Sequence, residues 1–108
     1  AIFAANDEMA PGALEAADAA QRLDTVSAIG FDAIPDALDN IRTGRLLGSV
    51  AQFPGETGRL GVMYAAVLLR EGVRPPEAVL TKVEIIDLSN LETFEMATGP
   101  AVDEMGTP

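Results

Sequence analysis

Hydrophobic and polar positions alternate along the chain in blocks that predict strands and helices in turn. Four apolar stretches have the length of strands, and they are residues 1–5, 26–31, 46–52 and 79–88. Between them, residues 8–22, 35–44 and about 55–71 carry apolar side chains at helical spacing. The second stretch, "VSAIGF", is almost entirely apolar, as in strands covered by helices on both faces. This order predicts an α/β fold with a doubly wound, mostly parallel sheet.

Prolines and glycines mark the predicted boundaries of these elements. Pro35 is suited to the first position of the second helix, and Gly44 to its C-terminal cap. Gly72 ends the third helix, and residues 73–78, which contain two adjacent prolines, form a linker. From Ser89 the periodicity fades, and residues 92–108 contain acidic side chains, prolines and glycines. We therefore expect one domain over residues 1–91 and a loosely ordered acidic tail over residues 92–108.

Polar side chains follow three of the predicted strands at the point where each strand ends. Asn6 and Asp7 follow the first, Asp32 follows the second, and Gln52 ends the third. Ligands of parallel α/β sheets bind outside the carboxyl ends of the strands, so these residues should lie on one rim. Amides and carboxylates together supply donors and acceptors, which suits the hydroxyl groups of a sugar or polyol. A phosphate site would instead call for a glycine-rich turn or a basic residue.

Helix capping is an alternative role for most of these polar residues. Asn and Asp are preferred at helix N-termini, and Asp32 also precedes a predicted helix. We assign Asp7 and Glu8 to the start of the first helix, where carboxylates favour the positive end of the helix dipole. Gln52 is harder to explain as a cap, because Gln is not a favoured capping residue. We predict that Asn6, Asp32 and Gln52 contact a ligand.

Charge and composition exclude several functions. The formal net charge is −10, from 17 acidic and 7 basic residues, which argues against nucleic acid and anionic membranes as partners. The chain has neither Cys nor His, which removes disulfides, thiol nucleophiles, imidazole bases and nearly all zinc chemistry. Asp7, Asp32 and Asp36 could act as acid and base or hold magnesium, but their spacing does not pair them. We expect neither an enzyme nor a cofactor.

The beginning of the chain is relevant to targeting and to whether the chain is a fragment. No apolar run approaches the length needed to span a bilayer, and no basic-then-apolar leader opens the chain. The first residue is Ala and already lies in a strand-like run. We expect a processed chain or a fragment, whose targeting signal could have been lost upstream.

Three motifs at their spacing resemble a known family. They are "NDEMA" at residues 6–10, "GFD" at 30–32, and "AQ" followed by Pro54 at 51–54. With "TKVEIIDLSNL" at 81–91, they are similar to the C-terminal part of ribose-type periplasmic sugar-binding proteins, the solute receptors of ABC importers. The likeness covers residues 1–91 and implies a partial lobe of a type I periplasmic-binding-protein fold.

The resemblance also implies a site, partners and a location. In this family the corresponding Asn, Asp and Gln hydrogen-bond sugar hydroxyls, which are Asn6, Asp32 and Gln52 here. It implies a periplasmic protein that works with an ABC permease, and whose other lobe lies outside this chain. The strand from Ala1 to Ala5 would then lack a neighbour, so we expect it to pair with the rest of the receptor or with a homodimer partner.

Two alternatives remain. The lactose-repressor family shares this fold and similar motifs, so the chain could be the effector-binding domain of a transcription regulator. The sequences "RLDTVSAIGFD" and "RLLGSVAQFPG" lack the Pro and Thr-Thr features common there, which favours the transporter branch. The other alternative is a truncated fragment that keeps the fold but does not bind ligand.

Overall fold

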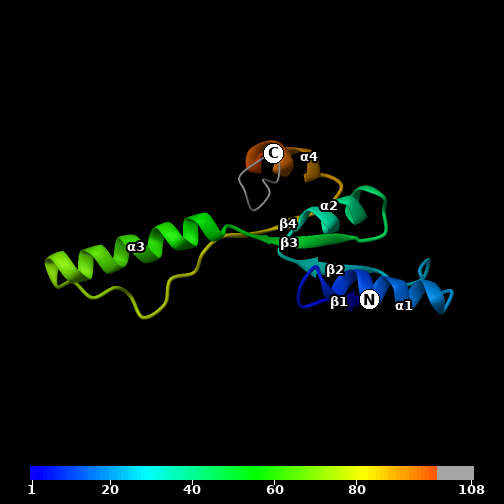
Figure 1. Cartoon of the computed structure of the whole chain (residues 1–108), viewed down its shortest axis with the longest axis horizontal. Helices are drawn as coiled ribbons and strands as arrows, with labels where there is room; N and C mark the ends of the chain where they lie inside the picture. Colours follow the sequence, from blue (N-terminus) through cyan, green and yellow to red (C-terminus); the bar gives the residue numbers. More distant parts are fainter. Residues whose placement is uncertain (100–108) are drawn as a thin grey trace, which may run out of the picture. The chain divides into compact units, whose positions relative to one another are not determined.

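The structure, a computed structural model, describes residues 1–99. It divides into two units. The first contains residues 1–51 and the described residues from 84 onward, and the second contains residues 52–83. Strands and helices alternate from the N-terminus (Figure 1). In order, the elements are β1 (Ile2–Phe3), α1 (Met9–Ala19), β2 (Ala28–Phe31), α2 (Pro35–Arg42), β3 (Gly48–Gln52), α3 (Pro54–Glu71), β4 (Val83–Ile86) and α4 (Leu91–Thr98).

The sheet has the strand order β1-β2-β3-β4. β1 pairs parallel with β2, with Ile2 opposite Ala28, and β2 pairs parallel with β3, with Gly30 opposite Ser49. The predicted α/β fold with a mostly parallel sheet is confirmed. Because neighbouring strands are parallel, the carboxyl ends of β1 and β2 meet at one edge of the sheet.

A small aliphatic core holds the first unit together. The sheet contributes Ala28, Ala51 and Ile86, all at 1% exposure or less, and helices α1 and α2 pack on it. Core residues of α1, of α2 and of the segment after it are Ala10, Leu14, Ala37, Leu38, Ile41 and Leu46, and Leu91 at the start of α4 joins them. Alanine is frequent among these core residues, and its small side chain permits helix and sheet to pack closely.

Several predicted boundaries coincide with the observed ones. Pro35 is the first residue of α2, and Gly44, two residues past the end of that helix, has a φ of +77°. Gly72 caps α3 in the left-handed conformation, with a φ of +68°. Such positive φ angles are costly for residues with a Cβ, which explains the glycines.

Two elements differ from the expectation. The last strand spans only Val83–Ile86, not residues 79–88. Residues 92–98, which we expected in a loose tail, belong instead to helix α4. Leu91, 3% exposed, packs into the core, and the Arg42 guanidinium donates to the Glu95 carboxylate at 2.5 Å. The prediction for residues 100–108 lies outside the described residues.

The second unit is dominated by α3. Its predicted apolar stripe is present, yet none of the residues of this described helix is buried. Within this unit, Lys82 Nζ lies 4.9 Å from the centroid of the Phe53 ring. Within residues 1–99, no helix has both the length and the hydropathy that a membrane-spanning segment requires.

Candidate functional site

Asn6 lies just past β1, where the chain turns into α1. Its side chain is half-buried, and its Oδ1 accepts a hydrogen bond from the Met9 N–H at 2.9 Å. The next backbone N–H, of Asp7, donates to the Phe31 carbonyl at 2.8 Å. Asn6 therefore sits at the carboxyl end of β1, beside the end of β2, and it also satisfies the first N–H of the helix.

Asp32 lies directly after β2 in an unusual backbone conformation. Its N–H donates to the Val50 carbonyl at 2.8 Å, which continues the pairing of β2 with β3. Its φ is +107° and that of Ala33 is +53°, and the Asp32 side chain is exposed. The structure thus brings Asn6 and Asp32 to the same edge of the sheet, at the ends of adjacent parallel strands.

Gln52 is the last residue of β3, and it is exposed. It is also the residue at which the second unit of the chain begins. The register of β2 and β3 pairs Phe31 with Val50, two residues before Gln52. The sequence position of Gln52 at the carboxyl end of its strand is therefore as predicted.

Asp7 has a different role from the one we predict for it. Its side chain is only 1% exposed, and its carboxylate accepts hydrogen bonds from Ser49 Oγ at 2.8 Å and from the Ile34 N–H at 3.0 Å. Assigning Asp7 to the start of α1 is wrong, because its carboxylate joins β1 to β3 and to the segment before α2. Glu8 occupies the N-cap position of α1 without a side-chain hydrogen bond to the helix.

Ser49 and Gly30 complete this buried contact, and the sequence pattern did not reveal that Ser49 is a partner of Asp7. Ser49 is fully buried, and its Oγ accepts a hydrogen bond from the Ala33 N–H at 3.0 Å. A Cβ on Gly30 would lie 1.8 Å from Asp7 Oδ1, so only glycine leaves room for the carboxylate. A Ser inside an apolar strand, beside a strand with a central Gly, is the signal that could have revealed a buried polar partner.

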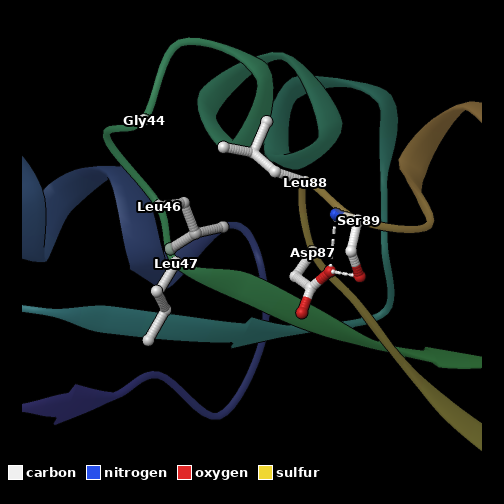
Figure 2. Close-up of a pocket in the computed structure, with 6 residues that line it drawn as sticks. All are labelled: Gly44, Leu46, Leu47, Asp87, Leu88 and Ser89. Atoms are coloured by element: carbon white, nitrogen blue, oxygen red, sulfur yellow. Dashed lines mark hydrogen bonds between the residues drawn. The ribbon is translucent and has the colours of Figure 1, made fainter.

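A shallow pocket in the same unit lies at the other end of β3. Figure 2 shows Leu46, Leu47 and Leu88 on its walls, with Asp87 and Ser89 beside them. Asp87 Oδ1 accepts hydrogen bonds from the Ser89 N–H at 2.8 Å and from Ser89 Oγ at 2.5 Å. None of the predicted site residues lines this pocket, and its polar groups are engaged with each other.

These local hydrogen bonds set the acidity of Asp87. The Ser89 hydroxyl, followed by the Ser89 N–H, stabilises the ionised carboxylate and holds its pKa below the usual 3.8. Across residues 1–99 no cluster of three acidic side chains could hold a metal ion.

Comparison with known proteins places these residues in a family context. The model of the periplasmic binding protein domain matches residues 1–72. The chain is 43% identical over 70 residues to the ribose import binding protein RbsB of Salmonella typhimurium, covering 65% of this chain and 23% of that protein. It is 38% identical over 96 residues to a putative rhizopine-binding protein of Rhizobium meliloti, covering 88% of this chain and 31% of that protein.

Solved structures show the same likeness. The myo-inositol binding protein of Caulobacter, with myo-inositol bound, is 37% identical with a TM-score of 0.71, covering 85% of this chain and 31% of that one. An ABC transporter solute binding protein of Agrobacterium vitis, bound with α-D-tagatopyranose, is 29% identical with a TM-score of 0.74, covering 89% and 32%. The chain therefore spans about a quarter to a third of the length of these relatives.

Proposed function

We propose a function from the premise that this chain belongs to the periplasmic binding protein domain family. It supplies one wall of the binding site of a sugar or polyol receptor, and that receptor delivers its ligand to an ABC permease. The observation that carries the proposal is the placement of Asn6 and Asp32 at the carboxyl ends of adjacent parallel strands, inside the stretch that matches the family.

The chemistry of these side chains fits hydroxyl groups. Asp32 is exposed at the edge of the sheet, and a carboxylate is an acceptor that suits the hydroxyl groups of a sugar ring. Asn6 uses its Oδ1 for the Met9 N–H, so its Nδ2 is the group that would donate to a ligand oxygen. We propose a ligand contact for Gln52 as well, from its place as the last residue of β3.

The ligand class is drawn from relatives. Proteins similar to this chain are named for ribose, for allose and for myo-inositol, all of which present rings of hydroxyl groups. Relatives are binding proteins, and we propose that this chain likewise has no enzyme activity. A relative from Escherichia coli is named as periplasmic, and we propose that location here. The relatives named here favour this function over the effector domain of a lactose-repressor-type regulator.

The edge strand provides a further element of the proposal. β1 is the terminal strand of the described sheet, and Phe3 is 67% exposed. An edge strand offers unpaired backbone groups to another chain. We propose that β1 pairs with a strand from the remainder of the receptor or with a second copy of this chain.

Substitution of Asp32 tests the ligand-binding role. Loss of a hydrogen bond donated to a charged acceptor costs about 1.5–3 kcal/mol, so Asp32→Ala should weaken binding roughly ten- to hundredfold. Binding of D-ribose, D-allose and myo-inositol is followed by chemical-shift changes in two-dimensional NMR of the labelled chain. Asp24→Ala, which removes an exposed carboxylate in the loop before β2, is the matched control. Equal affinity of the two variants for every sugar would refute the assignment.

The two roles of Asn6 can be separated by an isosteric change. Asn6→Asp keeps an oxygen for the Met9 N–H but replaces the amide donor with a second acceptor. We expect stability close to that of the original chain together with weaker sugar binding. Unchanged affinity would mean that Asn6 serves only the helix.

A further inference from the structure

The segment after β2 contains two consecutive residues with positive φ and a side chain. Asp32 has a φ of +107° and Ala33 of +53°. Residues with a Cβ seldom adopt such angles, and the surrounding structure has to hold them there. The conformation of Asp32 is therefore imposed on it by other residues.

The groups that impose it are Asp7 and Ser49. The two backbone N–H groups that follow Asp32 both donate to this pair, Ala33 to Ser49 Oγ at 3.0 Å and Ile34 to Asp7 Oδ2 at 3.0 Å. Ser49 Oγ in turn donates to the Asp7 carboxylate at 2.8 Å. Each acceptor thus fixes one peptide group of the turn.

Burial makes this arrangement rigid. Asp7 is 1% exposed and Ser49 is fully buried, so water cannot replace either hydrogen bond without opening the site. Gly30 admits the Asp7 carboxylate against β2, where any larger residue would occupy its position. The carboxylate is therefore confined to the place from which it reaches the turn.

We propose that Asp7 and Ser49 are positioning residues, which hold the turn at residues 32–34 so that the Asp32 carboxylate faces the ligand. The inference rests on the proposed function of Asp32. Asp7 and Ser49 are buried, and they act on binding only through the backbone of this turn. Loss of the Ser49 hydroxyl should therefore release the turn and weaken sugar binding while Asp32 itself is unchanged.

Amide hydrogen exchange tests the turn without any ligand. Ser49→Ala should speed the exchange of the Ala33 amide roughly tenfold beyond any change in global unfolding, because its acceptor is lost. Ser49→Thr retains a hydroxyl and should restore slow exchange. Ile41→Val, a buried change in α2 that removes no hydrogen-bonding group, is the matched control for lost stability. Equal effects of Ser49→Ala and Ile41→Val on the Ala33 amide would overturn the inference.

Binding of myo-inositol and D-ribose completes the test, with affinities compared at equal folded fractions. Ser49→Ala should bind about tenfold more weakly, whereas Ser49→Thr and Ile41→Val should bind like the unaltered chain. If Asp32→Ala weakens binding as expected and Ser49→Ala binds like Ile41→Val, the positioning role is wrong and the proposed function stands. If Asp32→Ala binds normally, the proposed function fails, whatever the exchange experiment shows about the turn.

Discussion

Gly30 offers the sharpest test of the buried contact of Asp7, in the segment between β1 and α1, with Ser49 of β3. Gly30→Ala adds one methyl group, and its carbon would lie 1.8 Å from Asp7 Oδ1 and 3.1 Å from Asp7 Cγ. The carboxylate cannot move aside freely, because Ser49 and the Ile34 N–H hold it in a buried position. Either β2 shifts away from α1, or the Asp7 side chain leaves its hydrogen bonds.

The expected loss of stability follows from these contacts. Overpacking a buried site costs about 1–3 kcal/mol, and each hydrogen bond to a charged group contributes about 1.5–3 kcal/mol. Replacing glycine by alanine returns roughly 0.5–1 kcal/mol by restricting the unfolded chain. The net loss should be about 2–4 kcal/mol, a large part of the roughly 5–15 kcal/mol by which domains are stable.

Urea unfolding followed by circular dichroism measures this loss. Gly12→Ala is the matched control, because Gly12 lies in α1 and a Cβ there has no neighbour within 4 Å. That variant should gain about 0.5–1 kcal/mol from helix propensity. In an Asp7→Ala background, Gly30→Ala should cost less than in the original chain, since the clashing group is gone. A loss below about 0.5 kcal/mol for Gly30→Ala alone would refute the close contact.

Three further predictions concern other parts of the first unit. Gly48→Ala places a Cβ 2.8 Å from the Ile86 carbonyl oxygen and should lower the free energy of unfolding by about 1–3 kcal/mol, as measured in urea; no loss would contradict the close approach of β3 and β4. Ser89→Ala should raise the pKa of Asp87 toward 3.8 in a carboxyl NMR titration. Because folding lowers this pKa, the stabilising contribution of Asp87 is present above pH 3.8 and is lost as the pH falls through the folded-state pKa. An unchanged Asp87 pKa in the Ser89→Ala variant would refute this role of Ser89. Phe3→Pro should abolish pairing at the β1 edge, and sedimentation that still reports a dimer would exclude that edge as the interface.

The fold class could be predicted because it depends on local patterns. Alternating apolar and amphipathic segments determine which parts become strands or helices, and Pro35 and Gly72 mark helix ends through their own backbone preferences. The ends of strands depend on partners instead, since a strand extends only as far as its neighbour bonds to it. The last strand accordingly spans Val83–Ile86 within a longer apolar stretch. The sequence pattern did not predict helix α4, because contacts of Leu91 and Glu95 with distant residues stabilise it.

The candidate site was predictable in part for the same reason. Strand ends in a parallel sheet share one edge, so the placement of Asn6 and Asp32 follows from topology alone. The role of Asp7 does not, because its partners Ser49 and Ile34 are 42 and 27 residues away in the chain. Rules for helix starts consider only neighbours in sequence. They therefore assigned to Asp7 the capping function that Asn6 performs.

Because Asn6 and not Asp7 accepts the first N–H of α1, the two carboxylates at this edge of the sheet, Asp7 and Asp32, have different roles. A residue that binds ligand must keep its polar atoms available, whereas a residue that holds backbone must be buried and saturated with hydrogen bonds. Asp7 meets the second condition, whereas Asp32 is exposed on a turn with positive φ, and we propose that its carboxylate contacts the ligand. Of these two residues, which follow adjacent strands, the buried Asp7 fixes the backbone that carries the exposed Asp32. We therefore propose that ligand affinity at this edge of the sheet depends on hydrogen bonds that the ligand itself does not make.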